Sequence, residues 1–373
     1  MGIADSPHGG NLARAALEYG HSEKELLDFS ANINPLGPPP GVYSAVMEEF
    51  WRVRHYPDPD CGVLTQLLAD YLGVTRENLI VGNGGAELIY LLPRVLRLER
   101  VLVVAPTFSE YAEAVKANGG EVTYVTVPPG EEIFPAEKIA GQLPGCDAVF
   151  ICNPNNPTGR LLGPEELAPL LEAAAAGGAM LIVDEAFMDF APRRENLSLM
   201  GPACRRRELL VLYSMTKFFG LPGLRLGAAV AGAPVIERLK RVKAPWSVNA
   251  LAAVAGAAAL QDRGHMAETL RTVDQERDFL FSALASIPGL NPFPSAANFL
   301  LLDISGSGMS SFELVEKMAG LGILVRNCAN FYGLDDNFVR VAVRTRAENK
   351  ILAESLGRVA GGGQGQPTRY KMR

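Results

Sequence analysis

The sequence predicts an α/β fold, with a mostly parallel sheet covered by helices on both faces and a second, smaller α+β unit. Short apolar runs alternate with amphipathic segments between residues 79 and 231, as strands alternate with helices. This alternation stops after residue 232, where alanine-rich and amphipathic helical segments follow. The 373 residues also exceed what one hydrophobic core usually supports, so about two domains are expected.

The predicted sheet uses seven apolar runs, each bounded by turn residues. Two helices, 41–54 and 63–72, precede it, and two more, 248–261 and 264–286, follow it. The C-terminal α+β unit has strands near 298–303, 323–326 and 338–343 and helices at 312–319 and from 346. The strands of the sheet are 79–82, 100–104, 121–125, 147–152, 179–184, 209–213 and 226–231, and its helices are 86–96, 109–118, 136–142 and 164–176.

This pattern predicts a division of the chain into four parts. Residues 1–55 form an N-terminal arm and helix that join the small domain, and residues 56–263 form the large domain. Residues 264–360 form a bridging helix and the small C-terminal domain. The glycine-rich, polar tail 361–373 is expected to be disordered.

Composition excludes several classes of function. The net charge of −6 argues against nucleic acid or an anionic membrane as a general partner. Five scattered cysteines without a C-x-x-C pair indicate reduced thiols, and four histidines without paired spacing predict no metal site. Residues 1–12 lack the build of a signal peptide, and no apolar run reaches membrane-spanning length. A cytoplasmic location is therefore expected.

The stretch Leu209 to Gly227 contains the most reactive pattern of the chain. A buried strand is followed at once by Ser214, Thr216 and Lys217, and then by Arg225. Hydroxyls and a guanidinium suit a phosphate, and a nearby amine suits a Schiff base with pyridoxal phosphate. A plain surface lysine is the alternative. Ser214 to Lys217 also matches the S-x-x-K nucleophile motif of penicillin-binding proteins and β-lactamases, but the K-T-G strand of that fold is missing.

Three other strand ends contain candidate chemistry. The turn Gly82 to Glu87 opens a helix, whose free N–H groups favour a phosphate. The stiff turn Asn153 to Gly159 presents Asn156 to a ring substituent or a carboxylate, although Asn, Pro and Gly are also ordinary turn residues. Asp184 ends an apolar strand, where a buried carboxylate needs a cation such as a protonated pyridine nitrogen.

Further candidates lie outside the sheet. His8 and Gly9 precede a helix that we expect Asn11 to cap; they form either an anion cradle or a flexible terminus. The extended segment 27–40 offers the side chains of Asn32 and Asn34, or is a plain linker. Two arginines within apolar strands, Arg326 and Arg340, either reach solvent or face an anion.

Taken in order, the motifs GNGGAE, PTFSEY, CNPNNPTG, DEAF, SMTKFFGLPGLRLG and RVAVR resemble those of the fold-type I pyridoxal-phosphate enzymes. The resemblance covers residues 6 to 358 and lies in the branch of the histidinol-phosphate aminotransferases. Within that branch, HGGN, DFSANINPLGPP, YPDP, PWSVN and RNCANFYGL look most like the threonine-phosphate decarboxylases of cobalamin biosynthesis. The resemblance therefore implies decarboxylation of O-phospho-L-threonine to (R)-1-amino-2-propanol O-2-phosphate, with histidinol-phosphate aminotransfer as the alternative.

The resemblance also implies roles for individual residues. Lys217 would bind the cofactor covalently, Asp184 would pair with its pyridine nitrogen, and Phe108 would stack on its ring. Asn156 would approach the phenolic oxygen of the ring. A homodimer with shared active sites is implied, in which Tyr56 of a second subunit would help to bind the phosphate. The other phosphate ligands would be Gly84, Gly85, Ser214, Thr216 and Arg225, and the substrate ligands would be His8, Gly9, Asn32, Asn156, Arg326 and Arg340.

One position departs from the aminotransferases of this fold. Many of those aminotransferases have a tyrosine at the position of Phe187, whereas the decarboxylases that this chain resembles have phenylalanine there, as this chain does. Phenylalanine has no hydroxyl to donate to the phenolic oxygen, so this residue favours the decarboxylases. A non-enzymatic alternative is the aminotransferase-like sensor domain of some regulators. Those proteins carry an added DNA-binding domain, for which the residues before Tyr56 leave no room.

Overall fold

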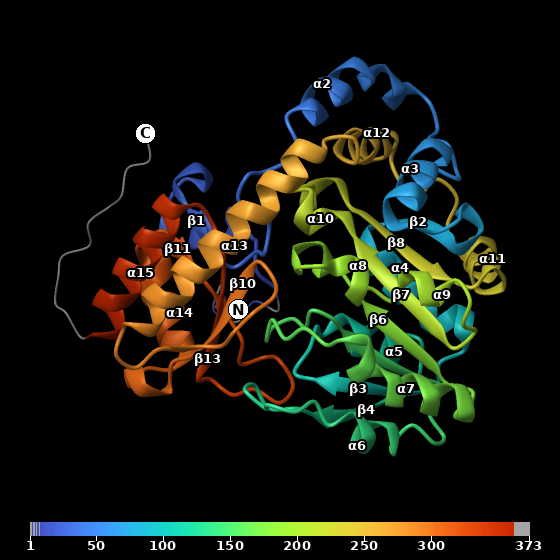
Figure 1. The fold of residues 1–373 in the computed structure, drawn as a ribbon. Coiled ribbons are helices and arrows are strands. Elements are labelled where there is room, and N and C mark those ends of the chain that lie inside the picture. The colour runs from blue at the N-terminus through green and yellow to red at the C-terminus, as the bar shows by residue number, and fades with distance from the viewer. Residues whose placement is uncertain (1, 3, 5, 7, 362–373) are drawn as a thin grey trace.

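The structure is a computed structural model that describes residues 2, 4, 6 and 8–361. Its centre is a seven-stranded sheet of order β2-β8-β7-β6-β5-β3-β4 (Figure 1). All seven predicted strands are confirmed. The predicted disorder of the tail 361–373 falls, except for Gly361, outside the described residues. The strands are β2 (Leu79–Asn83), β3 (Arg100–Ala105), β4 (Glu121–Thr126), β5 (Ala148–Cys152), β6 (Met180–Asp184), β7 (Leu209–Ser214) and β8 (Leu226–Ala231).

The sheet is mostly parallel, as predicted. Only β8 runs against its neighbours β2 and β7, and the remaining pairs are parallel. Parallel strands end at one edge of a sheet, so the turns after them lie close together. Cys152 of β5 is in register with Asp184 of β6, which is in register with Leu212 of β7. The acid at 184 therefore lies at the same edge as the lysine that follows β7.

Helices cover both faces of this sheet, since neighbouring residues of its inner strands are apolar and each face must be buried. In β7, Leu210 and Leu212 pack on one face and Val211 on the other. The first face is covered by α4 (Gly84–Leu96), α5 (Glu110–Ala117) and α11 (Ala233–Val242). The second face is covered by α3 (Gly62–Leu72), α6 (Ala136–Ala140), α7 (Pro164–Gly177), α9 (Met200–Ala203) and α12 (Ala250–Ala259).

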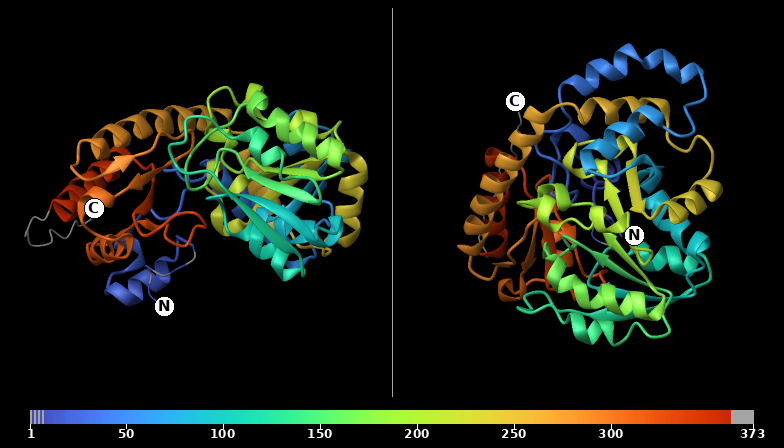
Figure 2. Two further views of the ribbon diagram at one scale, coloured as in Figure 1. Left: turned by 90° about the horizontal axis from the view of Figure 1, so that it is seen from below. Right: turned by 45° about the vertical axis from the view of Figure 1, so that its right-hand side comes forward.

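The alanine-rich helix α12 is tightly packed, as predicted. A Cβ at Gly256 would lie 2.8 Å from a methyl of Leu226 and 3.0 Å from one of Leu64. The predicted helix 41–54 is interrupted: α2 (Gly41–Glu48) is followed by a 3₁₀ helix, η3 (Phe50–Arg54), and α2 crosses the outside of α12 (Figure 2).

The smaller, C-terminal unit contains a four-stranded sheet of order β12-β13-β10-β9. The long helix α13 (Arg263–Ala285) leads to it from α12 (Figure 1). The predicted strand 323–326 is divided between β11 (Ile323–Leu324) and β12 (Arg326–Asn327), which belong to different sheets. The other elements are β9 (Asn291–Pro292), β10 (Phe299–Asp303), β13 (Phe338–Ala342), α14 (Ser311–Gly320) and α15 (Arg346–Ala360).

The N-terminal segment joins this second unit. Helix α1 (Leu12–Tyr19) is capped as predicted, because the Asn11 side chain accepts a hydrogen bond of 3.1 Å from the Arg14 N–H. Strand β1 (Leu27–Asp28) pairs in parallel with β11. The division into four parts stays a prediction. Within the described part of the chain, no helix combines the length and apolar character needed to cross a membrane.

Candidate active site

Most of the predicted site residues line one cavity of about 390 Å³ at the carboxyl edge of the large sheet. Lys217 lies in α10 (Met215–Phe218), which begins directly after β7, and the Ser214 side chain caps this short helix. The cavity thus brings together residues from the N-terminal segment, both sheets and their turns. The predicted residues that line it are His8, Gly9, Asn32, Gly85, Phe108, Asn156, Asp184, Ser214, Thr216, Lys217, Arg225, Arg326 and Arg340.

The environment of Lys217 favours a neutral amine. Burial lowers the pKa of Lys217 to about 8, helped by the positive charges of Arg340 and Arg225 and opposed by Asp184. A lysine is nucleophilic only when deprotonated, so a pKa near neutrality increases its reactive fraction. A plain surface lysine, one of the alternatives left open by the sequence, does not fit this buried position.

Two neighbouring acids at the end of β6, Asp184 and Glu185, lie on opposite sides of the sheet. Asp184 reaches the cavity, where it accepts hydrogen bonds from the Tyr111 hydroxyl at 2.7 Å and the Ala186 N–H at 2.9 Å. Glu185 accepts bonds instead from the Ser198 hydroxyl at 2.6 Å and the Leu199 N–H at 2.7 Å. Burial raises the pKa of both, that of Glu185 to about 7. Only Asp184 is placed to meet a ligand.

The corner between α4 and β8 has the chemistry of a phosphate site. Gly84 has a φ of +78°, and a Cβ there would lie 2.7 Å from the Arg225 guanidinium. The Ser214 and Thr216 hydroxyls are 2.8 Å apart in the same cavity. Backbone N–H groups of a helix start, two hydroxyls and a guanidinium are the donors that a phosphate dianion needs.

Gly227 makes this corner possible. A Cβ at Gly227 would lie 2.5 Å from the backbone nitrogen of Gly85. Only a residue without a side chain lets β8 approach the start of α4 this closely. Sequence reasoning passed over Gly227, which was marked only as the end of the lysine motif.

Arg340 crosses from the four-stranded sheet to the catalytic edge of the large sheet. Its guanidinium donates hydrogen bonds to the Asn156 side chain and, at 2.9 Å, to the Ser30 carbonyl. Its Nε is buried without a partner among the described residues, as is Oδ1 of Asn32, another residue of the cavity. Burial lowers the pKa of Arg340 to about 10. A buried cation with an unused donor is suited to an anionic ligand.

Arg326 lies beside Arg340, because the two residues are in register across β12 and β13. It donates hydrogen bonds to the Asn330 side chain at 2.7 Å and to the carbonyls of Asn327 and Ser6. Its guanidinium also lies 5.2 Å from the centre of the Phe331 ring. Both arginines are buried and line the cavity, so neither reaches for solvent.

His8 and Gly9 form one wall of the cavity. Nε2 of His8 lies 3.0 Å from a carboxylate oxygen of Glu110, and its ring lies 5.9 Å from that of Phe108. A Cβ at Gly9 would be 2.3 Å from the Ser30 carbonyl oxygen, so only glycine allows this approach. His8 and Gly9 are therefore packed against the cavity and are not part of the flexible terminus considered as an alternative.

Comparison with known proteins agrees with this geometry. The family model described as aminotransferase class I and II matches residues 24–356. The chain belongs to this family. It is 38% identical to the threonine-phosphate decarboxylase of Salmonella typhimurium, over 97% of this chain and 99% of the relative. It is 32% identical to the histidinol-phosphate aminotransferase of Methanothermobacter thermautotrophicus, over 94% of this chain and 93% of the relative.

Solved structures show the same fold. The histidinol-phosphate aminotransferase from Clostridium acetobutylicum superposes with a TM-score of 0.84 at 30% identity, covering 90% of this chain and 100% of the other. The L-threonine-O-3-phosphate decarboxylase from Porphyromonas gingivalis superposes with a TM-score of 0.79 at 29% identity, covering 89% and 98%. The predicted fold-type I architecture is thus confirmed, and the chain is an enzyme that depends on pyridoxal 5′-phosphate (PLP).

The cavity of this family member fits PLP. A buried lysine of lowered pKa, a buried acid and a phosphate corner lie around one space, and Asp184 retains acceptor capacity beyond its two hydrogen bonds. The family assignment removes the serine-hydrolase alternative for Ser214 and Lys217, because its fold is different.

Two predicted site residues, Gly84 and Tyr56, are not among those that line this cavity: Gly84 borders the Arg225 guanidinium, whereas Tyr56 lies away from the cavity. Its side chain is 81% exposed and packs on the Trp246 ring at 4.8 Å. It borders a different cavity, of about 440 Å³, between the α2 to α3 region and α12. Its role in the site of a second subunit stays a prediction.

Tyr111 is the functional candidate that sequence reasoning missed. It lines the cavity and donates a hydrogen bond to Asp184, and in the sequence it is the last residue of the PTFSEY motif. Phe108 precedes α5 and Tyr111 lies in its first turn, so helical spacing does not relate the two residues. The hydrogen-bond partner of Tyr111 lies on another element.

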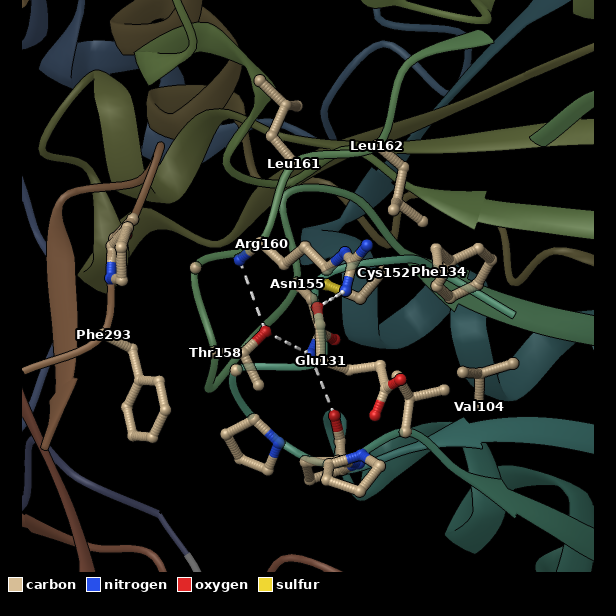
Figure 3. Close-up of a pocket in the computed structure, with 18 of the residues that line it drawn as sticks. Val104, Glu131, Phe134, Cys152, Asn155, Thr158, Arg160, Leu161, Leu162 and Phe293 are labelled. Carbon is tan, nitrogen blue, oxygen red and sulfur yellow. Dashed lines mark hydrogen bonds between the residues drawn. The ribbon is translucent and has the colours of Figure 1, made fainter. Parts of the chain in front are cut away.

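A larger cavity of about 580 Å³ lies on the other side of the Asn153 to Gly159 turn (Figure 3). Its cation, Arg160, donates to the carbonyls of Glu131 and Glu132 at 2.6 and 3.3 Å. Among the described residues that line it there is no lysine or aspartate. Its lining therefore lacks the groups that PLP chemistry needs, and we assign the reaction to the smaller cavity.

Proposed function

We propose that this enzyme decarboxylates O-phospho-L-threonine to (R)-1-amino-2-propanol O-2-phosphate and CO2, the reaction of cobalamin biosynthesis. The observation that carries the proposal is the pair Arg326 and Arg340, buried side by side at the cavity of Lys217. An amino acid with a second anionic group needs two cationic contacts, one for the carboxylate and one for the phosphate. The 38% identity to a threonine-phosphate decarboxylase supports the same substrate class.

The residues divide into cofactor and substrate ligands in this proposal. Lys217 would bond PLP covalently, Asp184 would pair with its ring nitrogen, Phe108 would contact its ring and Asn156 its phenolic oxygen. The phosphate would be held by Gly84, Gly85, Ser214, Thr216 and Arg225, with Tyr56 from a second subunit. The substrate would be held by His8, Gly9, Asn32, Asn156, Arg326 and Arg340, all of which line the cavity.

The geometry of substrate binding selects the bond that breaks. PLP, when bound, supplies an electron sink for a bond at Cα of the substrate. Arg340 and Arg326 would hold the two anionic groups of the substrate, and this positioning would decide which bond at Cα breaks. The carboxyl group then leaves as CO2, and Lys217 or a water returns a proton to Cα. The low pKa of Lys217 suits such a proton transfer.

Phe187 supports decarboxylation over aminotransfer. Its ring is buried, lines the cavity and packs edge-on against Phe299 at 5.0 Å. Phenylalanine offers no hydroxyl to the cofactor, in contrast to the tyrosine of many aminotransferases of this fold. The alternative function is histidinol-phosphate aminotransfer, which the 32% identity and the TM-score of 0.84 to enzymes of that name favour.

A product assay decides between the two functions. The purified holoenzyme is incubated with O-phospho-L-threonine in the absence of any 2-oxo acid, and CO2 and the amino-alcohol phosphate are measured. We expect both products. Amino transfer from glutamate to imidazole-acetol phosphate, without CO2 from phosphothreonine, would instead establish the aminotransferase.

We also propose that the enzyme is a homodimer with shared active sites. Apolar side chains are exposed together on the α2 to α3 region and the nearby 243–248 loop, beside α12. Monomeric proteins rarely expose so many large apolar side chains in one region, so a second copy of the chain is the occupant that fits. These residues are Tyr43, Met47, Phe50, Trp51, Val53, Tyr56, Val63 and Trp246.

A further inference from the structure

Tyr111 joins three parts of the active site from a fully buried position. It projects from the first turn of α5, and its ring stacks on Phe150 of β5 with centres 5.0 Å apart and planes at 13°. Its other side meets Phe108 edge-on at 5.7 Å. Its hydroxyl donates to Asp184 of β6 at 2.7 Å. Packing on both sides therefore fixes the direction in which this hydroxyl points.

The two oxygens of Asp184 each receive one donor. Tyr111 donates to Oδ2, and the Ala186 N–H donates to Oδ1 at 2.9 Å. A carboxylate has about four lone-pair positions, so each oxygen keeps one for a further donor. One donor comes from the buried Tyr111 of α5 and the other from the turn directly after β6, and together they determine the plane of the carboxylate.

We propose that Tyr111 is a positioning residue, which orients the Asp184 carboxylate toward the ring nitrogen of PLP and keeps it ionised. This inference rests on the proposed pairing of Asp184 with that nitrogen, and not on which reaction follows. Tyr111 itself need not touch the cofactor. It acts through Asp184: by keeping this carboxylate ionised, it favours the protonated, positively charged form of the PLP ring on which the chemistry depends.

The charges around Asp184 make this hydrogen bond important. The titratable groups that face it are Tyr111 from α5, Cys152 from β5 and Lys217 from α10, and Glu185, on the opposite side of the sheet, adds a nearby charge. Burial raises the pKa of Asp184, whereas the hydrogen bond from Tyr111, the Ala186 N–H and the charge of Lys217 lower it. Burial also raises the pKa of Tyr111 well above its usual value, so its hydroxyl keeps the proton that it donates.

Tyr111→Phe tests the proposal, because it keeps the stacked ring and removes only the hydroxyl. Apoprotein is titrated with PLP, and the visible absorbance of the bound cofactor is followed against pH, both without substrate. We expect about tenfold weaker PLP binding, the size of a lost hydrogen bond to a charged group. The absorbance midpoint should rise by about one pH unit, since a neutral ring no longer repels a proton on the Lys217 nitrogen.

Tyr71→Phe is the matched control. Tyr71 donates to another buried acid, Asp189, at 3.0 Å, and it lies outside the cavity. Its removal should cost stability but leave both PLP affinity and the absorbance midpoint unchanged. Equal changes in the two variants, or no change in Tyr111→Phe, would overturn the proposal.

A PLP analogue with carbon in place of the ring nitrogen separates positioning from a structural role. Wild type and Tyr111→Phe should bind this analogue equally well, because it offers Asp184 no cation. A tenfold loss for the analogue as well would mean that Tyr111 has only a packing role.

If Tyr111→Phe fails to fold, 3,5-difluorotyrosine at position 111 provides a stronger donor and should move the absorbance midpoint down; an unchanged midpoint would overturn the proposal. Neither readout depends on CO2 release, so the two proposals fail independently.

Discussion

Arg340 donates a hydrogen bond to the side chain of Asn156 and so joins the two sheets at the active site. Asn156 belongs to the turn after β5, and Arg340 to the middle of β13, 184 residues later. The same guanidinium reaches the Ser30 carbonyl in the N-terminal segment. A substrate anion bound by Arg340 would therefore be linked through this guanidinium to all three regions, and its binding would couple their positions.

Substitution of Lys217 should remove the covalent link to PLP. Lys217→Ala is expected to purify without the visible absorbance of a bound cofactor, because the cavity contains no other lysine among its described lining residues. Borohydride reduction followed by mass spectrometry checks the bond. Cofactor that stays covalently attached in the reduced variant would contradict the assignment of Lys217.

Arg326→Ala should raise KM for the phosphorylated substrate by roughly 10- to 100-fold, the equivalent of a lost charge-assisted hydrogen bond. Steady-state kinetics with phosphothreonine measure the change. Arg271→Ala is the control, since this arginine pairs with Glu268 on the exposed side of α13. Unchanged kinetics in Arg326→Ala would mean that Arg326 only holds its hydrogen-bond partners Ser6, Asn327 and Asn330 in place and does not bind substrate.

Gly84→Ala should weaken PLP binding, because the added Cβ meets the Arg225 guanidinium at 2.7 Å and the backbone has a φ of +78°. We expect a loss of at least about tenfold in affinity, with kcat at saturating PLP less affected. Titration of the apoprotein measures it. Gly177→Ala in α7, where a Cβ would meet nothing within 4 Å, serves as the control and should bind PLP as the wild type does.

The buried Lys217 should make the apoprotein more stable as pH rises. Its pKa in the folded chain, about 8, lies below its ordinary value of 10.5. Between these values the unfolded chain binds more protons, so the free energy of unfolding increases with pH in this window. Denaturant unfolding of the apoprotein at pH 8 and pH 10 should show a gain of roughly 1–3 kcal/mol relative to Lys217→Met. An identical pH dependence in that variant would place the amine in solvent.

Active-site sharing predicts complementation between inactive variants. Tyr56→Ala and Lys217→Ala should each have low activity, and a mixture that exchanges subunits should regain activity from sites built of two intact halves. Sedimentation of each variant checks that dimers persist. A monomer in sedimentation, or a mixture no more active than its parts, would confine Tyr56 to the surface packing with Trp246 seen in one chain.

Local sequence determined the elements and their chemistry. Short runs of strand length marked all seven strands of the large sheet, and the inner ones are apolar because helices cover both of their faces. Polar residues at strand ends marked Asp184, Asn156 and Lys217, since a strand end is where a turn must expose its backbone and side chains. The hydroxyls, lysine and arginine after the 209–213 strand suggested the cofactor, motif resemblance supported it, and the family assignment bears it out.

Only the tertiary structure decided which of these residues meet. The Tyr111 hydroxyl reaches Asp184 across 73 residues, and Arg340 reaches Asn156 across 184. No periodicity encodes such contacts, because they depend on the order of strands in the sheet and on how the helices pack over it. Two neighbouring acids show the difference: Asp184 lines the cavity, whereas Glu185 accepts a hydrogen bond from Ser198, because the packing around the sheet decides which of its sides borders the cavity.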